Sequence, residues 1–278
     1  MKKTVAVIGL GLIGASVAKA IKKSTKHFVY GFDIDEKTMI KACEDESIDA
    51  GLCEGDLKKC DYVIVALYPG DTIKFVEENI GKFSKNCVII DCSGTKKEIC
   101  SRLSPLAREN GLYFIGGHPM AGIERSGYKH SFAEMFEGAT MILCRDKSTN
   151  LIALKAAELF FLEIGFGRVT VTDAETHDRN IAFTSQLAHL VSSAYIKSPT
   201  AEAQDGFSAG SYKDLTRVAR LNPEMWTQLF MENKEALLFE TKEIIKHLGE
   251  YAEAMENNDA EGLYRLLKQG SDIKEKIG

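Results

Sequence analysis

Near the N-terminus stands the segment VAVIGLGLIG, residues 5–14, in which four apolar residues lead into three spaced glycines. A short run without polar residues is typical of a central strand in a parallel sheet. Apolar residues at helical spacing follow from Leu12 to Lys22. A strand, a GxGxxG turn and a helix in this order predict the first unit of a dinucleotide-binding sheet.

The three glycines of this turn serve different purposes when a dinucleotide binds. Gly9 permits the tight turn, Gly11 lets the backbone approach the pyrophosphate, and Gly14 allows the helix to pack closely on the sheet. Leu12 and Ile13 open the helix, whose unpaired N–H groups and partial positive charge favour phosphate. We therefore predict that these five residues hold the cofactor. The alternative is the same turn without a nucleotide.

An acidic residue stands where the adenosine ribose of a dinucleotide would lie. Asp33 ends the second predicted strand, about 20 residues beyond the last glycine of the turn. A carboxylate at this place accepts a hydrogen bond from the ribose 2′-hydroxyl and repels a 2′-phosphate, which favours NAD over NADP. Two alternatives stay open: Asp35 as the ribose ligand, or Asp33 as a plain turn residue.

Strands and helices are predicted to alternate as far as residue 172. Apolar runs typical of strands recur at residues 28–32, 62–67, 87–90, 113–115, 140–143 and 169–171. Asp71 is the expected cap of the helix after residues 62–67, and the order Thr95-Lys96-Lys97-Glu98 has the form of a capping box. The alternation predicts a Rossmann-type, doubly wound parallel sheet.

After about Thr172 the sequence shows helical spacing only. Asn222 and Pro223 are typical of a helix start, and apolar residues then recur as far as Leu248, which predicts one long amphipathic helix. We therefore predict an α/β protein with an NAD-binding domain at 1–172 and an all-helical domain for substrate binding and dimerisation at 173–278. The helical part is small, so a second subunit is expected to cover its apolar faces in a homodimer.

The composition is that of an ordinary globular protein, with 45% hydrophobic and 27% charged residues and a net charge of -5. Interspersed charges argue against a nucleic acid or an anionic membrane as partner. No apolar stretch approaches the roughly 18 residues needed to span a bilayer. The seven cysteines include no CxxC pair, which indicates reduced thiols and a cytoplasmic protein, and we expect no metal site.

One histidine stands where the sheet is expected to bind ligands. The run GGHPMAG, residues 116–122, follows a predicted strand that ends at Ile115, so His118 lies at the carboxyl edge of the sheet. The glycines around it are expected to leave room for a substrate. A histidine here can act as the base for an alcohol that is being oxidised. The alternative is a loop histidine bonded to the backbone.

Further motifs follow in a fixed order along the chain. They are HPMAGIERSG at 118–127, HD at 177–178, SQLAH at 185–189, KDLTRVA at 213–219 and PEMW at 223–226. Together they resemble the HPxAG-x-E-x-SG, HD…SHLPH, KDxTRxA and PxxW segments of prephenate and arogenate dehydrogenases, over residues 5 to about 234. This resemblance implies NAD-dependent oxidation and decarboxylation of prephenate to 4-hydroxyphenylpyruvate in tyrosine biosynthesis. Arogenate dehydrogenase, or a cyclohexadienyl dehydrogenase that accepts both substrates, is the alternative.

The resemblance also implies a role for each matching side chain. His118 would hydrogen-bond the C4 hydroxyl of the substrate and accept its proton as hydride leaves. Arg217 would bind a substrate carboxylate, for which a planar guanidinium is suited. His189 would contact the substrate side chain, with Ser185 one turn before it on the same face, and Glu124 would organise the pocket. Apart from the resemblance, each residue has a structural alternative. Arg217 would belong to a solvated basic face, His189 would be a hydrogen-bonded helix residue, and Glu124 would be a surface carboxylate.

Two positions depart from the family pattern. The segment DCSGTK, residues 91–96, has Gly94 where many members have a serine near the catalytic histidine, and Ser93 or Thr95 is the candidate replacement beside the cofactor. Gln186 stands where the first histidine of SHLPH is expected, so it can hydrogen-bond a substrate but carries no charge. The choice between prephenate and arogenate therefore stays open.

Two other functions fit part of the sequence. A 3-hydroxyacid dehydrogenase shares the plan of a dinucleotide-binding sheet followed by helices, but it usually relies on a lysine where Gln186 and His189 stand. A non-catalytic NAD-binding sensor is supported only by Gly94 and Gln186. Turnover of a cyclohexadienyl substrate would separate the enzyme from the sensor.

Overall fold

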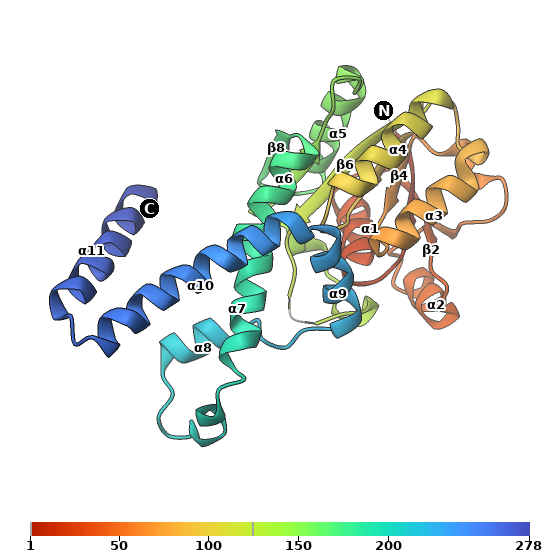
Figure 1. Ribbon diagram of the computed structural model, residues 1–278. Helices are drawn as coiled ribbons and strands as arrows, with labels where there is room; N and C mark the ends of the chain where they lie inside the picture. Colours follow the sequence, from red (N-terminus) through yellow and green to blue (C-terminus); the bar gives the residue numbers. More distant parts are fainter. Residues whose placement is uncertain (1, 124) are drawn as a thin grey trace.

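The computed structural model describes residues 2–123 and 125–278. Within them, one sheet has the strand order β3-β2-β1-β4-β5-β6-β7-β8 (Figure 1). Its strands are β1 (Thr4–Ile8), β2 (Phe28–Phe32), β3 (Ala50–Gly51), β4 (Tyr62–Val65), β5 (Val88–Asp91), β6 (Tyr113–Met120), β7 (Thr140–Cys144) and β8 (Arg168–Thr172). Neighbouring strands run parallel except β6 and β7, which are antiparallel. The predicted Rossmann-type sheet is confirmed, and the prediction that it is wholly parallel is wrong at this one pairing.

Helices cover both faces of the sheet because successive residues of a strand point to opposite sides. They are α1 (Leu12–Ser24), α2 (Glu36–Glu44), α3 (Pro69–Asn79), α4 (Lys97–Glu109) and α5 (Leu151–Glu163). Val5 and Val7 of β1 belong to one buried cluster with residues of α1 and α5, whereas Ala6 and Ile8 belong to a second cluster with residues of α3 and α4. The doubly wound arrangement is therefore confirmed.

The strand that carries the candidate base is longer than predicted. It was expected to end at Ile115, but β6 continues and pairs His118 with Ile142 of the antiparallel neighbour β7. The glycines before the histidine do not make room for a substrate, because a Cβ at Gly117 would lie 2.4 Å from the carbonyl oxygen of Asp91. Close backbone packing explains these glycines, and His118 lies in a strand rather than in a loop.

The part after Thr172 is helical throughout the described residues, as predicted. It contains α6 (Ala174–Ile181), a π-helical segment (Ala182–Gln186), α7 (Leu187–Tyr195), α8 (Gly210–Thr216), α9 (Pro223–Glu232), α10 (Lys234–Glu256) and α11 (Ala260–Ile277). The single long helix predicted from Asn222 to Leu248 is wrong. α9 and α10 meet at the buried residue Asn233, whose side-chain amide donates to the Asp178 carbonyl and to Gln186 Oε1, both at 2.8 Å.

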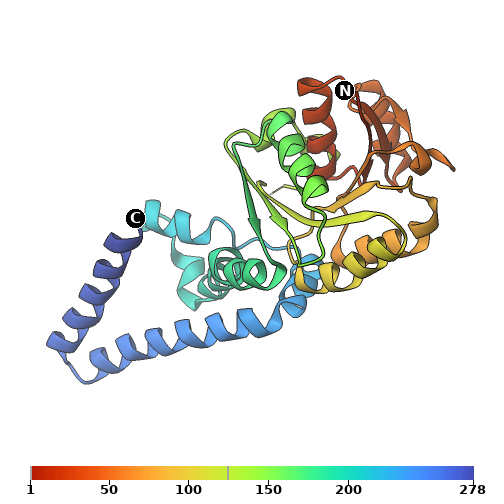
Figure 2. The ribbon, with the colours of Figure 1, turned by 90° about the horizontal axis from the view of Figure 1, so that it is seen from above.

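Much of α10 and all of α11 extend away from the sheet domain in two perpendicular views (Figure 1, Figure 2). Among the described residues, α10 buries only Leu237 and Ala254, and α11 buries none. Across residues 2–123 and 125–278, no helix is both long enough and apolar enough to cross a bilayer.

Candidate active site

The glycine turn between β1 and α1 has the geometry of a dinucleotide site. Gly9 has a φ of +86° and donates its N–H to the Phe32 carbonyl at 2.8 Å, and a Cβ at Gly14 would lie 1.9 Å from the Gly9 carbonyl oxygen. Both positions therefore require glycine. At Gly11, the N-cap of α1, no atom of a described residue beyond its own chain neighbours lies within 4 Å of the place a Cβ would take. The turn is open where a pyrophosphate would approach the N–H groups of Leu12 and Ile13.

The two acidic candidates for the ribose have different positions. Asp33 lies against the glycine turn, where its carboxylate accepts the Leu10 N–H at 2.8 Å and the Asp35 N–H at 3.0 Å. The Asp35 side chain instead caps α2 by accepting the Thr38 N–H at 3.1 Å. Asp33 is therefore the carboxylate that adjoins the candidate phosphate site, and Asp35 has a structural partner of its own.

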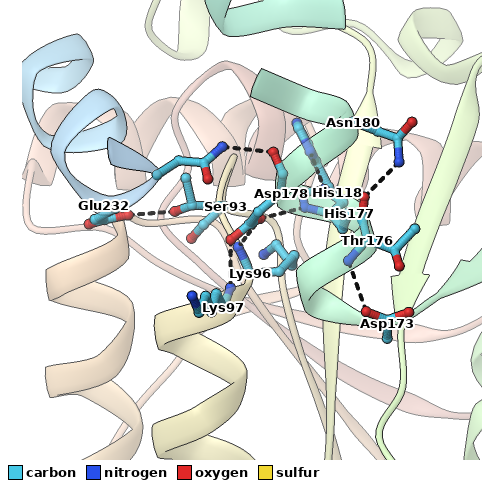
Figure 3. Close-up of polar contacts among 12 residues, drawn as sticks. Ser93, Lys96, Lys97, His118, Asp173, Thr176, His177, Asp178, Asn180 and Glu232 are labelled. Carbon is cyan, nitrogen blue, oxygen red and sulfur yellow. Dashed lines mark hydrogen bonds and ion pairs between the residues drawn. The ribbon is translucent and has the colours of Figure 1, made fainter. Parts of the chain in front are cut away.

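His118 is the first member of a chain of hydrogen bonds. Its Nδ1 lies 2.9 Å from Nε2 of His177, and Nδ1 of His177 lies 2.7 Å from an oxygen of Asp178 (Figure 3). The Asp178 carboxylate also accepts the backbone N–H groups of Lys96 and Lys97, each at 2.8 Å. The sequence left the HD pair at 177–178 without a role, although it matched the family motif. The structure brings it into contact with the candidate base.

The capping box predicted at residues 95–98 is wrong. Lys96 occupies the N-cap position of α4 and makes no side-chain cap bond. Asp178, on α6, accepts the free N–H groups instead, and a carboxylate at a helix N-terminus is favoured by the helix dipole. The cap of α3 also differs from prediction, because Tyr68 is the N-cap and Asp71 lies inside the first turn.

Burial determines the protonation state of the two histidines. Burial lowers the pKa of His118 well below 6.5, and the nearby His177 and Lys96 lower it further. The pKa of His177 is also lowered, mainly by burial, although the Asp178 carboxylate opposes this. Both rings are therefore neutral at pH 7, and His118 is in the form that can accept a proton.

A buried ion pair holds the loop between β5 and α4 against β6. Lys96 and Asp91 have fully buried side chains and bond each other. Asp91 also accepts the Gly117 N–H and the Ser93 N–H, both at 3.0 Å. Since Gly117 directly precedes His118, this network fixes the backbone that carries the histidine.

The hydroxyls of Ser93 and Thr95 have partners other than His118. Ser93 Oγ donates to the Leu67 carbonyl at 3.5 Å, and Thr95 Oγ1 donates to the half-buried Glu232 of α9. At the glycine of this loop, Gly94, an added Cβ would lie 3.3 Å from the Leu229 side chain. The segment that replaces the family serine is thus occupied by contacts with α9.

The candidate substrate residues of the helical part lie on different elements. Ser185 and Gln186 belong to the π-helical segment, and such segments recur at functional sites. The Ser185 carbonyl lies 2.9 Å from Nδ1 of His189, whose ring centroid lies 4.1 Å from that of Trp226. Arg217 is exposed directly after α8. Glu124 lies outside the described residues.

Gln186 has protein partners at both ends of its amide. Its Nε2 donates to the Leu229 carbonyl at 3.1 Å, and its Oε1 accepts from Asn233 at 2.8 Å. The side chain is only 2% exposed. It therefore joins the π-helical segment to α9 and to the start of α10.

Comparison with known proteins covers almost the whole chain. A family model described as prephenate dehydrogenase, nucleotide-binding domain, matches residues 17–171, and one described as prephenate dehydrogenase, dimerization domain, matches residues 173–269. Prephenate dehydrogenase of Lactococcus lactis subsp. cremoris is 28% identical over 99% of this chain and 77% of its own length.

Two solved structures share the fold over their full length. A crystal structure of prephenate dehydrogenase from A. aeolicus, in complex with hydroxyphenyl propionate and NAD+, has a TM-score of 0.86 at 26% identity and covers 100% of this chain and 99% of that one. The crystal structure of Synechocystis arogenate dehydrogenase has a TM-score of 0.83 at 25% identity and covers 99% of this chain and 100% of that one.

Proposed function

Because the chain belongs to the prephenate dehydrogenase family, we propose that it oxidises prephenate to 4-hydroxyphenylpyruvate and CO₂ with NAD as hydride acceptor. The membership confirms the predicted family, the class of NAD-dependent oxidoreductases and the cofactor. The observation that carries the proposal is a half-buried, neutral histidine at the edge of the sheet where folds of this type bind their ligands.

The proposed roles begin with the cofactor site. The open turn at Gly11 and the N–H groups at the start of α1 hold the pyrophosphate of NAD, and Asp33 accepts from the ribose. Ser93 and Thr95 lie in the loop after β5, on the cofactor side of the sheet. When bound, NAD supplies the acceptor for the hydride from C4 of the substrate.

His118 is the proposed general base. Its ring accepts the proton of the C4 hydroxyl while hydride leaves C4 and the ring carboxylate departs as CO₂, which leaves an aromatic product. A neutral imidazole can do this at pH 7 without prior deprotonation.

The helical part supplies the proposed substrate contacts. Arg217 binds a carboxylate, and the ring of His189, placed by the Trp226 ring and the Ser185 carbonyl, contacts the substrate side chain. Glu124 keeps its proposed role at the pocket. For Gln186 the engaged amide supports an indirect role, in which it holds the π-helical segment that carries Ser185.

The proposed assembly is a homodimer formed through the helical part. We divide the chain into a nucleotide-binding domain at 1–172 and a substrate-binding and dimerisation domain at 173–278, consistent with the description of the second family model. Exposed apolar side chains on α10 and α11 support a partner there. The seven cysteines are free thiols, which suits the proposed cytoplasmic location.

The test is NADH formation by the purified chain, offered prephenate and arogenate separately, each with NAD and with NADP. Turnover of prephenate with NAD supports the proposal, and faster turnover of arogenate supports the alternative substrate. Protein that binds NAD but turns over neither compound contradicts the proposal and favours the sensor.

A further inference from the structure

The inference concerns the pair beside the candidate base, His177 and Asp178. Their side chains are 0% and 5% exposed, so bulk water does not compete with the hydrogen bonds between them. Asp178 accepts two backbone N–H groups at the start of the 13-residue helix α4. A carboxylate that accepts such donors acts as a hydrogen-bond acceptor, because an ionised carboxylate has no hydrogen to donate.

The ionised carboxylate determines where the proton of His177 resides. Nδ1 of His177 lies 2.7 Å from an Asp178 oxygen, so this nitrogen carries the hydrogen and donates it. In a neutral ring the other nitrogen, Nε2, then has a lone pair and accepts. Because Nε2 lies 2.9 Å from Nδ1 of His118, His118 must donate through Nδ1. Its Nε2 is left as the basic nitrogen.

We propose that His177 and Asp178 are positioning residues that hold His118 in the tautomer with Nε2 unprotonated and ready to accept the substrate proton. This inference rests on the proposed function, because it assigns how the proposed base is oriented. When Nε2 takes the proton from the C4 hydroxyl, the ring becomes cationic. Its Nδ1–H then donates to His177, and the charge of Asp178 at the end of the chain stabilises the cation.

The loop between β5 and α4 offers His118 no other side chain that could orient its ring in place of His177 and Asp178. Gly94 has no side chain at the place of the family serine, and the hydroxyls of Ser93 and Thr95 bond Leu67 and Glu232. The nearby cation, Lys96, is paired with Asp91.

The experiment compares two replacements of the middle residue. In His177→Gln, the amide can still donate to Asp178 and accept from His118, so we expect kcat on prephenate to stay within about 10-fold of the parent. In His177→Leu, of similar bulk but without polar atoms, we expect kcat to fall by about 10–100-fold, with KM and the Kd for NAD unchanged. Thermal unfolding of both variants serves as the control for folding.

Nitrogen-15 NMR of labelled histidines reads the tautomer without any turnover. We expect Nδ1-protonated His118 in the parent and in His177→Gln, and a mixture of tautomers in His177→Leu. An Nε2-protonated His118 in the parent overturns the inference even if the leucine variant does not fold. Equal loss of kcat in both variants, with an unchanged tautomer, overturns it as well. A parent that shows the expected tautomer but does not oxidise prephenate contradicts the proposed function and leaves the hydrogen-bond chain intact.

Discussion

At the level of single residues, the environment of His118 combines a neutral base with buried charge nearby. Burial holds the pKa of the ring well below 6.5, and the neighbouring Lys96 acts in the same direction. The positive charge of Lys96 is balanced by Asp91, which also fixes the backbone of Gly117. An unpaired lysine at this place would oppose formation of the imidazolium, so the buried pair is part of what makes His118 usable as a base.

The two acidic residues after β2 allow a matched test of cofactor recognition. For Asp33→Ala we expect the Kd for NAD to rise by about 10-fold or more, because a charge-assisted hydrogen bond to the ribose is lost. The Kd for NADP should rise less, since the repulsion of its 2′-phosphate is also removed. Isothermal titration measures both constants.

Asp35→Ala is the control for this experiment. Its side chain caps α2, so this variant should lose about 1 kcal/mol of unfolding free energy and keep its affinity for NAD. Loss of NAD affinity in Asp35→Ala but not in Asp33→Ala would reverse the assignment of the ribose ligand.

At the level of elements, α9 joins the helical part to the loop that carries Gly94. Glu232 accepts from Thr95 Oγ1 and, at 2.9 Å, from the Gln228 amide. Burial raises the pKa of Glu232 above 4.5, although both hydrogen bonds act in the opposite direction. The folded protein therefore binds this proton more tightly than the unfolded chain does, and stability falls as the pH rises through the raised pKa.

Glu232→Gln removes this titration while keeping an acceptor for Thr95. We expect the variant to gain unfolding free energy relative to the parent at neutral pH, and to gain less near pH 4.5. Urea unfolding at the two pH values measures the difference. The control is Glu235→Gln. The Glu235 side chain is 91% exposed, so this substitution should change stability by less than about 0.5 kcal/mol. If the difference in unfolding free energy between the parent and Glu232→Gln is the same at both pH values, the pKa of Glu232 is not raised in the folded protein.

Some helices and strands could be predicted from local sequence patterns, and others could not. Apolar periodicity and glycine spacing predicted the glycine turn and the strands of the first domain apart from β3, which is only two residues long. The extension of β6 past Ile115 depends on pairing with β7, and the break at Asn233 depends on its bonds to Asp178 and Gln186. These partners are distant in sequence, so periodicity alone predicted a shorter strand and one long helix.

The candidate site could be predicted less fully than the fold. His118 and the glycine turn stood out by motif and by position after a strand. The contact of His118 with His177 joins residues 59 positions apart, and only the fold brings them together. The N-terminus of α4 is likewise capped by the Asp178 carboxylate, which is distant in sequence. The residues next to α4 predicted Thr95 as the cap instead, but its hydroxyl bonds Glu232.

At the level of the whole molecule, α10 and α11 contact each other, but the described part of the chain leaves much of their apolar surface uncovered. Their large apolar side chains remain substantially exposed, among them Leu238, Phe239, Ile245, Leu248, Met255, Tyr264, Leu267, Ile273 and Ile277. Apolar surface of this extent is typical of an interface rather than of a free surface. The projecting helices (Figure 2) are therefore the expected contact of the proposed homodimer.

The dimer prediction concerns two residues of α10. Ile245 and Leu248 are 62% and 60% exposed, and in a two-fold dimer each substitution acts twice. The double variant Ile245→Glu, Leu248→Glu should weaken dimerisation by about 3 kcal/mol or more and yield monomer in light scattering. Leu159→Glu is the control, since Leu159 of α5 is 57% exposed on the sheet domain and should leave the dimer intact. A parent that is monomeric, or a double variant that stays dimeric, would refute this interface.

The most direct test of the account is the turnover of His118→Asn on prephenate with NAD. Asparagine keeps the size and polarity of the side chain but is not a base, so we expect unchanged NAD affinity and a kcat lower by about 10²–10⁴-fold. A variant that binds NAD normally and oxidises prephenate at nearly the parent rate would contradict the role of His118, and with it the proposed mechanism.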